Sequence, residues 1–450
     1  MDKYDLAILG GGPGGYIAAI RAAQLGAKVA LIEKDKLGGT CINRGCIPTK
    51  AIIACTNLYE KMQKAESFGI SADKAAIDFK KVIDRKNEVV NKLVKGIDFL
   101  LRKNKIDIIY GEGKVLEPGK VEVTRQDSPS TSLGASSKLL VVSSKLILAT
   151  GSSPASLPGL NFDKEKYLCS DDLLEYRPIP EKLNIVGGGV IGIHFAQIYS
   201  ALGAEITVYE ALPEILAGVD EEIVGEVKKI LKRKKVNVLA GTKFDPAKSS
   251  GKTLICIGRT PNLIGIEALN LKMEKRSVWV NEKMETSLPD VYAVGDLVSK
   301  KMLAHVAYEQ GVIAAENALG GNRTFSYEYI PFGIYTHPEI GAVGMTEKEA
   351  REKYQNIKIG KFPFIALGIA KAMGEIEGFI KVISDENDRI VGVHILGPEA
   401  TDQIGMATIA VKNGLKVEQL AETFQSHPSY PEGLQEAALH TLKRALHIIN

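Results

Sequence analysis

This 450-residue chain contains few cysteines and little tryptophan, and its net charge is small. It has five cysteines and one tryptophan, and 57 Lys and Arg stand against 54 Asp and Glu, for a formal net charge of +3. So few cysteines make no disulfide framework, and the near balance of charge gives no reason to expect a nucleic acid or membrane partner. No apolar run reaches the length of a membrane span. We therefore expect neither kind of partner, so any partner must be inferred from individual sites.

The size and the first residues of the chain limit its organisation. A chain of 450 residues allows two to four domains of roughly 100 to 200 residues each, and its 45% hydrophobic content can fill their cores. The opening MDKYDLAILGGG runs directly into a predicted strand, which leaves no room for a targeting segment. We expect a cytoplasmic protein, in which a close cysteine pair is more often catalytic or metal-binding than structural.

Cys41 and Cys46 form the close pair, within Gly38-Gly39-Thr40-Cys41-Ile42-Asn43-Arg44-Gly45-Cys46-Ile47-Pro48-Thr49-Lys50. No other Cys or His lies near them in sequence, so we predict no metal site. The remaining cysteines are scattered singly and are interpreted as buried apolar side chains: Cys55, Cys169 and Cys256. A helix is predicted to begin near Pro48, and its N-terminus would stabilise a thiolate. This favours a redox-active dithiol with Cys46 nearer the cofactor.

A strand, a glycine loop and a helix occur twice along the chain. Residues 4–9 lead into Gly10-Gly11-Gly12-Pro13-Gly14-Gly15, a helix over 16–25 and a strand over 28–32 that ends on Glu33. Residues 183–186 lead into Gly187-Gly188-Gly189-Val190-Ile191-Gly192, a helix to 202 and a strand over 205–209 that ends on Glu210. In both copies the acid follows the first glycine by 23 residues (10 to 33 and 187 to 210). Two dinucleotide sites are implied.

Each residue of this fingerprint has a physical role. Gly10 allows the tight turn, Gly12 lets a pyrophosphate approach the helix N-terminus, and Gly15 permits close helix packing. Glu33 is expected to accept a hydrogen bond from an adenosine ribose hydroxyl. In the second copy an acid at Glu210, with no arginine in the following Ala211-Leu212-Pro213-Glu214, favours NAD over NADP.

Together with these motifs, five further segments resemble the flavoprotein disulfide reductases, and among them the dihydrolipoamide dehydrogenases. They are Ala149-Thr150-Gly151-Ser152, Gly258-Arg259-Thr260-Pro261-Asn262, the segment 286–296 ending Gly295-Asp296, Tyr335-Thr336-His337-Pro338-Glu339 and His427-Pro428-Ser429-Tyr430-Pro431-Glu432. The resemblance covers essentially the whole chain. It implies bound FAD and NAD, and oxidation of a dihydrolipoyl dithiol with reduction of NAD.

The resemblance also implies roles for particular residues. Cys41 would be the interchange thiol, Cys46 the thiol in charge transfer with the flavin, Lys50 a member of the same helix, and Asp296 a ligand of the flavin ribitol. The implied cofactor contacts are Gly10, Gly12, Gly14, Gly15, Glu33, Lys34, Gly39, Thr40, Lys50, Gly113, Ala149, Thr150, Gly151, Gly187, Gly189, Val190, Ile191, Gly192, Glu210, Gly258, Arg259, Gly295, Asp296, Met302, Leu303, Ala304 and His305.

Thiol exchange also requires a base that titrates near neutral pH, which points to histidine. His427 is the best candidate among seven histidines, because Glu432 follows across a turn and would orient the ring. By resemblance this pair reaches the dithiol of the other subunit, so the active site requires a homodimer. We interpret His337 as a structural residue of an interface strand, and His305 as a residue at the start of a flavin-proximal helix.

The expected architecture is α/β, with two Rossmann-like dinucleotide-binding domains and a C-terminal α+β dimerisation domain. The first part of the FAD domain is placed at 1–150, the NAD domain at 151–272, the second FAD part at 273–328 and the dimerisation domain at 329–450. Residues 78–103 are predicted to form a charged amphipathic helix whose lysines make a solvated face. Gln126 to Ser137 is predicted to be an exposed hairpin loop within a small antiparallel meander.

Three departures from the family pattern qualify this interpretation. His194 stands where the family usually has a glutamate that pairs with the lysine of the dithiol helix, so we expect uncompensated charge at Lys50, a raised flavin potential and weaker communication with nicotinamide. Only residues 241–252 separate two strands between which the family inserts a small meander, so the NAD domain is trimmed. Gln425 replaces a histidine that the lipoamide enzymes often carry two residues before the catalytic one.

Several alternatives stay open. The chain could act on another small dithiol, or could pass electrons to an acceptor other than NAD, given the trimmed domain. It could also serve chiefly as a docking subunit of a multienzyme complex, although intact Cys41, Cys46, His427 and Glu432 argue against pure scaffolding. Mercuric and large thioredoxin reductases are disfavoured because no redox centre lies at the C-terminus, and glutathione reductase because Glu210 favours NAD.

Overall fold

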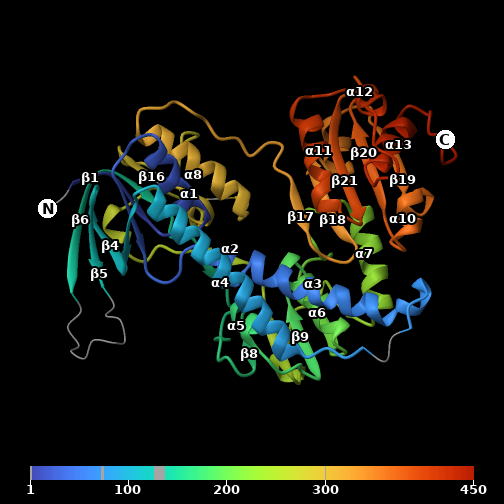
Figure 1. Ribbon diagram of the computed structural model, residues 1–450, viewed down its shortest axis with the longest axis horizontal. Helices are drawn as coiled ribbons and strands as arrows, with labels where there is room; N and C mark the ends of the chain where they lie inside the picture. Colours follow the sequence, from blue (N-terminus) through green and yellow to red (C-terminus); the bar gives the residue numbers. More distant parts are fainter. Residues whose placement is uncertain (1–2, 72–74, 126–136, 299) are drawn as a thin grey trace.

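The computed structural model describes residues 3–71, 75–125, 137–298 and 300–450. Three bodies make up the chain, one around the N-terminus, a second built around β9 and α6, and a third at the C-terminus (Figure 1). Of the loop expected at Gln126 to Ser137, residues 126–136 lie outside the described residues. None of the helices in the described ranges combines the length and the apolar character needed to cross a bilayer.

The first body contains a seven-stranded sheet in the order β3-β2-β1-β6-β5-β4, with β16 added beside β6. Strands β1, β2, β3, β6 and β16 run parallel, and β4 and β5 form the expected antiparallel meander with β6. The strands are β1 (Lys3–Leu9), β2 (Val29–Glu33), β3 (Asp107–Tyr110), β4 (Glu112–Glu117), β5 (Lys120–Thr124), β6 (Lys138–Leu148) and β16 (Val291–Ala293). The helices are α1 (Pro13–Gln24), α2 (Gly39–Arg44), α3 (Cys46–Gln63), α4 (Phe79–Lys103) and α8 (Ala304–Ala318).

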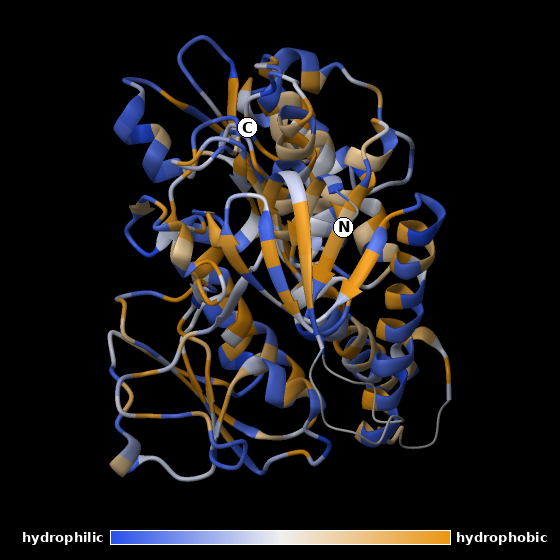
Figure 2. Cartoon of the chain, turned by 90° about the vertical axis from the view of Figure 1, so that its left-hand side faces the viewer, coloured by the Kyte–Doolittle hydropathy of each residue, from blue (hydrophilic) through white to orange (hydrophobic). Residues whose placement is uncertain are grey.

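Hydrophobic strands at the centre of this body are surrounded by helices with hydrophilic outer faces (Figure 2). Helix α4 buries Phe79, Ile83 and Leu101 on one face, and Asp78 caps its N-terminus by accepting from the amides of Lys80 and Lys81. Most lysines of α4 point to solvent, as predicted. Lys86 is the exception, because it is 1% exposed and forms an ion pair with Glu175.

The second body is a five-stranded parallel sheet in the order β11-β10-β9-β12-β8. Its strands are β8 (Tyr167–Leu168), β9 (Lys182–Val186), β10 (Glu205–Glu210), β11 (Asn237–Ala240) and β12 (Lys252–Ile255), and its helices are α5 (Ser170–Glu175), α6 (Val190–Ala201) and α7 (Glu221–Arg233). Short pairs form beside it from β7 (Ser152–Pro154) with β13 (Arg259–Pro261), and from β14 (Met273–Glu274) with β15 (Ser277–Val278). Residues 241–251 hold one 3-10 turn, Pro246–Lys248, and no strand. Residues 241–251 therefore form no meander, as the sequence predicted.

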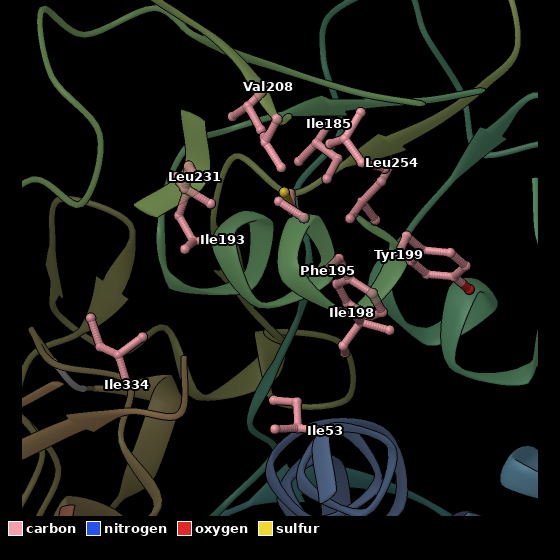
Figure 3. Packing of buried hydrophobic residues seen from close by; sticks show 14 of the residues in the cluster. Ile53, Ile185, Ile193, Phe195, Ile198, Tyr199, Val208, Leu231, Leu254 and Ile334 are labelled. Carbon is pink, nitrogen blue, oxygen red and sulfur yellow. The ribbon is translucent and has the colours of Figure 1, made fainter. Parts of the chain in front are cut away.

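Helix α6 ties the three bodies together through its core packing. Ile193, Phe195, Ile198 and Tyr199 of α6 pack in one buried cluster with Ile185, Val208 and Leu254 of the second sheet (Figure 3). Ile53 of α3 and Ile334 of the C-terminal body belong to the same cluster. Because protein interiors are close-packed, this shared core holds the dithiol helix α3 in a defined position against the second and third bodies.

The third body is a five-stranded antiparallel sheet in the order β17-β18-β21-β20-β19, covered by helices. Its strands are β17 (Phe332–Ile334), β18 (Glu339–Gly344), β19 (Lys358–Pro363), β20 (Phe379–Ser384) and β21 (Ile390–Gly397). Its helices are α9 (Glu347–Lys353), α10 (Gly368–Ala372), α11 (Ala400–Lys412), α12 (Val417–Ala421) and α13 (Glu432–Thr441). His337 lies in the loop between β17 and β18 rather than in the strand that the sequence predicts.

Several predicted element bounds move by a few residues. The helix expected at 16–25 begins at Pro13, because proline is well suited to the first turn. The helix expected near Pro48 begins at Cys46 itself, directly after Gly45, whose backbone (φ −145°, ψ −105°) is neither helical nor extended. Cys41 belongs to the separate short helix α2. The two cysteines are thus carried by different helices that meet at Gly45.

Candidate active site

A cavity of about 1710 Å³ lies between the three bodies and is lined by both glycine loops and by the dithiol. Both acids that end the second strands, Glu33 and Glu210, belong to its wall. The other predicted cofactor residues in the wall are Gly10, Gly12, Gly14, Lys34, Gly39, Thr40, Lys50, Gly113, Ala149, Thr150, Gly151, Gly187, Gly189, Val190, Ile191, Gly258, Arg259, Gly295, Asp296, Met302, Leu303, Ala304 and His305. Residues of the first two bodies and of the segment 330–335 thus converge on one space.

The two glycine loops have the same local geometry. Glu33 accepts from the amide of Gly11 at 2.7 Å and from that of Asp35 at 2.8 Å. Glu210 accepts from the amide of Gly188 at 2.7 Å and from that of Leu212 at 2.8 Å. Burial raises the pKa of Glu33, although the hydrogen bonds from the amides of Asp35 and Gly11 act to lower it. Each acid therefore lies beside the loop, where an adenosine ribose would be bound.

The loops leave space for a dinucleotide where the fingerprint requires it. A Cβ atom added at Gly189 would meet nothing within 4 Å, and one at Gly12 would meet only the Cα of Gly39, at 3.8 Å. Both glycines line the cavity and immediately precede a helix of 12 residues, and a helix N-terminus is the arrangement that binds pyrophosphate. The residues present therefore fit FAD at the first loop and NAD at the second.

Gly15 and Gly192 lie behind the cavity wall instead of in it. A Cβ at Gly15 would stand 1.8 Å from the carbonyl oxygen of Gly10, and one at Gly192 would stand 2.0 Å from that of Gly187. Only glycine allows the helix to approach its strand so closely. These two residues contribute through packing, as the fingerprint predicts for Gly15, and the structure shows no exposure of either to the cavity.

Cys41 and Cys46 are both free thiols at the cavity wall, with Cys41 buried and Cys46 half-buried. A hydrogen bond from the Cys41 thiol, together with the charge of Lys50 and the first amides of α3, lowers the pKa of Cys46 to about 7 against burial and Asp296. The same hydrogen bond and burial raise the pKa of Cys41. The dithiol therefore carries its negative charge on Cys46, the sulfur at the helix N-terminus.

Lys50 lies one turn into α3, and its ammonium stands over the ring of Tyr335, 4.5 Å from the ring centroid. Burial lowers the pKa of Lys50 against the negative charges of Cys46, Cys41 and Glu339. His194 does not pair with it. Burial and the charge of Lys50 hold the pKa of His194 well below its usual range, so the ring is neutral, and its Nε2 accepts from the amide of Tyr335 at 2.9 Å. The Lys50 ammonium therefore has the face of Tyr335 beside it, where the sequence predicted no partner.

A polar network joins the flavin-side residues of the wall. Arg259 donates from Nε to Ser152 Oγ at 2.7 Å and from Nη2 to the Ser152 carbonyl at 2.8 Å. Ser152 in turn donates to Asp296 Oδ2. His305 is the second residue of α8, and its Nε2 lies 2.9 Å from the carbonyl oxygen of Pro331. Sequence reasoning did not assign Ser152 or Tyr335 to the site, although both stand in segments that it quoted.

His427 and Glu432 form the predicted pair but lie outside the cavity. Nδ1 of His427 is 2.7 Å from Oε1 of Glu432, and the histidine side chain is 79% exposed. The pair stands at the start of α13, well separated from α2 and the dithiol (Figure 1). Within one chain the structure therefore does not bring base and dithiol together. Gln425 donates to Met406 Sδ of α11 at 3.8 Å and to the Thr423 carbonyl at 3.4 Å.

The remaining cysteines differ from each other. Cys169 and Cys256 are buried, as expected, but Cys55 is half-buried, 3.9 Å from an Arg85 nitrogen. Within the described ranges no three His, Cys, Asp or Glu side chains gather in a way that could hold a metal ion.

Two family models match the chain. The pyridine nucleotide-disulphide oxidoreductase model covers residues 4–311, and the dimerisation domain of the same class covers residues 330–438. The chain is 39% identical to a dihydrolipoyl dehydrogenase of Bacillus subtilis, over 99% of each chain, and 39% identical to one of Thermus scotoductus, over 100% of each. Among solved structures, LpdA of Mycobacterium tuberculosis superposes with a TM-score of 0.87 at 26% identity, covering 97% of this chain and 99% of that one. The HOCl-induced flavoprotein disulfide reductase RclA of Escherichia coli, solved with Cu(II), gives 0.85 at 26% identity with the same coverage.

Proposed function

We propose that this chain, which belongs to the pyridine nucleotide-disulphide oxidoreductase family, oxidises a protein-bound dihydrolipoyl group to its disulfide and reduces NAD. Its cofactors are FAD and NAD. The observation that carries the proposal is the Cys41–Cys46 dithiol, whose charge is held on Cys46 at the wall of a cavity that both glycine loops line.

The chemistry begins with Cys41 and Cys46 joined as a disulfide. His427 of a second copy removes a proton from one substrate thiol, and the resulting thiolate attacks Cys41 Sγ. A bond forms between the substrate sulfur and Cys41, the Cys41–Cys46 bond breaks, and Cys46 leaves as the thiolate. Lys50 and the N-terminus of α3 stabilise that leaving group.

The second substrate thiol then attacks its own partner sulfur in the mixed disulfide. The substrate disulfide forms, the bond to Cys41 breaks, the proton of the second substrate thiol passes to Cys41, and the first proton stays on His427. The substrate has lost two electrons and two protons, and the enzyme dithiol has gained the electrons. FAD, held by the residues around the first glycine loop, and NAD, held by those around the second, would supply the chemistry that carries these two electrons away. Cys41 would then give up its proton, and Cys41 and Cys46 would rejoin as the disulfide.

The proposed domain boundaries are 1–150 and 273–328 for the FAD domain, 151–272 for the NAD domain and 329–450 for the dimerisation domain. In support, β16 from the second FAD segment pairs in parallel with β6 from the first. The dimerisation-domain match supports a homodimer. We further propose a lipoyl-carrying protein as substrate, recruitment to a multienzyme complex, and a cytoplasmic location in line with the low cysteine content.

A second candidate is dithiol oxidation with an acceptor other than NAD. The observation in its favour is the trimmed second body, in which a single 3-10 turn replaces strands between β11 and β12. Glu210 argues for NAD, because its carboxylate is held at the loop in the same way as Glu33. The two candidates share the dithiol chemistry and differ only in the electron acceptor.

One anaerobic experiment separates these candidates. The purified flavoprotein is titrated with dihydrolipoamide and then with NAD, while the long-wavelength thiolate-to-flavin absorbance is followed. We expect the band to appear with dihydrolipoamide and to be discharged by NAD with formation of NADH. A band that NAD cannot discharge would favour the other acceptor, and a protein that forms no band with dihydrolipoamide would contradict both candidates.

A further inference from the structure

Lys50 lacks the carboxylate partner that its burial calls for. It is half-buried on the cavity wall, and no carboxylate in the described part of the chain forms an ion pair with it. Its nearest partner is the face of Tyr335, which lies in the loop between β17 and β18. An aromatic face attracts a cation through the ring quadrupole, and the attraction grows when water is excluded.

Tyr335 is held in place from both sides. Its backbone amide donates to His194 Nε2 at 2.9 Å, and His194 is 4% exposed on the buried helix α6. Its hydroxyl is hydrogen-bonded to Thr401 of α11, and Thr401 donates to Glu339 Oε2 at 2.7 Å. The ring is therefore fixed between α6 and α11, and Glu339 is the carboxylate whose charge acts on Lys50 through space.

We propose that Tyr335 is a positioning residue for the dithiol: its ring takes the place of a carboxylate partner of Lys50 and, held by His194, keeps the Lys50 ammonium directed at Cys46. This inference rests on the proposed function and goes beyond it. A carboxylate partner would cancel the charge of Lys50. The ring orients that charge without cancelling it, so the full positive charge acts on the Cys46 thiolate.

Several groups act on the Cys46 thiolate, and Lys50 is the cation among them. Cys41 donates a hydrogen bond to Cys46 from α2, Asp296 opposes the thiolate from the loop after β16, and Lys50 favours it from α3. The phenols of Tyr308 and Tyr335 face the same sulfur from α8 and the β17–β18 loop. Among these groups only Lys50 carries a positive charge, so a Lys50 side chain free to turn away would weaken the thiolate.

The test compares Tyr335→Leu with Tyr335→Phe in the two-electron-reduced holoenzyme. Its readout is the pH midpoint of the thiolate-to-flavin absorbance band, which reports ionisation of Cys46. Because Phe keeps the aromatic face, we expect its midpoint to stay at the parent value. In Tyr335→Leu we expect the midpoint to rise by about one pH unit, or roughly tenfold less thiolate at a given pH below it.

A second pair of variants protects the test against misfolding of Tyr335→Leu. His194→Leu removes the acceptor of the Tyr335 amide and should raise the midpoint, whereas His194→Gln keeps an acceptor oxygen and should raise it less. Unchanged midpoints in both leucine variants would overturn the proposal. So would equal shifts in Tyr335→Phe and Tyr335→Leu, because the hydroxyl would then be the active group. A parent protein with no band would instead contradict the proposed function.

Discussion

Nδ1 of His427 lies 2.7 Å from Oε1 of Glu432, while Oε2 of the same carboxylate accepts from the amide of Ser429 at 2.7 Å. One carboxylate thus fixes both the ring and the loop that carries it. Burial opposes ionisation of Glu432, but the hydrogen bonds from His427 and Ser429 outweigh it and lower its pKa. The orienting effect is therefore complete above the ordinary pKa of a glutamate and is lost only as the pH falls through this lowered value.

Glu432→Gln should slow dithiol oxidation roughly a hundredfold, because the imidazole loses the carboxylate that orients its ring. The measurement is the rate of flavin reduction by dihydrolipoamide in a rapid-mixing experiment. Glu436→Gln is the matched control. Glu436 lies one turn after Glu432 on α13, and its Oε1 is 2.9 Å from Nδ1 of His447. Equal losses in the two variants would mean that α13 was damaged in general.

Mixed dimers should recover activity that neither parent has. The exposed His427 and the dithiol lie far apart in one chain, so a complete site needs two copies. We expect Cys41→Ser and His427→Gln homodimers to be inactive, and dimers reassembled from both to regain part of the activity. Reassembled mixtures that stay inactive, although heterodimers are detected by mass, would contradict a site shared between subunits.

Cys46→Ser should abolish the thiolate-to-flavin band, whereas Cys41→Ser should keep the band and lose turnover. The reason is that the pKa of Cys46 is lowered to about 7, so it is the sulfur that ionises near neutral pH. In the parent protein the band should grow as the pH rises through this value. Absorbance spectra of both variants across the neutral range provide the check, and the reverse pattern would exchange the two roles.

His194→Glu should lower the flavin potential. The neutral, buried imidazole of His194 adds no charge beside Lys50, whereas a carboxylate there would compensate the ammonium and make reduction of the flavin less favourable. A redox titration against a reference dye measures the change, with His194→Gln as the uncharged control. A potential that does not move, or moves equally in both variants, would refute the prediction.

Lys381→Ala should destabilise the protein by about 3 to 5 kcal/mol, because it leaves the buried carboxylate of Asp220 without its cation. Lys381 is 1% exposed, and its Nζ lies 2.8 Å from Asp220, 3.0 Å from Glu222 and 3.0 Å from Glu347. Chemical denaturation measures the loss.

Lys348→Ala is the control for this cluster. Lys348 meets Glu221 at 4.0 Å, with side chains 66% and 81% exposed, so its loss should cost no more than about 1 kcal/mol. If Lys381→Ala cost as little as Lys348→Ala, the buried cluster would not be holding α7 against β20.

The sequence alone determined those features that depend on local patterns. The repeated strand, glycine loop and helix, the acids at Glu33 and Glu210, the close cysteine pair and the missing meander are all set by residues near each other in the chain. Even the favoured thiolate, Cys46, follows from its place at a helix N-terminus. Such features can be predicted because backbone sterics, helix ends and residue spacing act over one or two elements.

Only the tertiary structure decided which distant side chains meet. Lys50 and Tyr335 are far apart in sequence, as are Lys381 and Asp220, and no spacing rule links them. From the sequence, Lys50 was predicted to lack a partner because position 194 holds histidine instead of glutamate. Folding instead brings the ring of Tyr335, from another body, beside its ammonium. The lysines of α4 were likewise predicted to form a solvated face, but Lys86 is buried against Glu175. Long-range polar contacts of this kind depend on how separate hydrophobic cores dock, and that docking is a property of the whole packed chain.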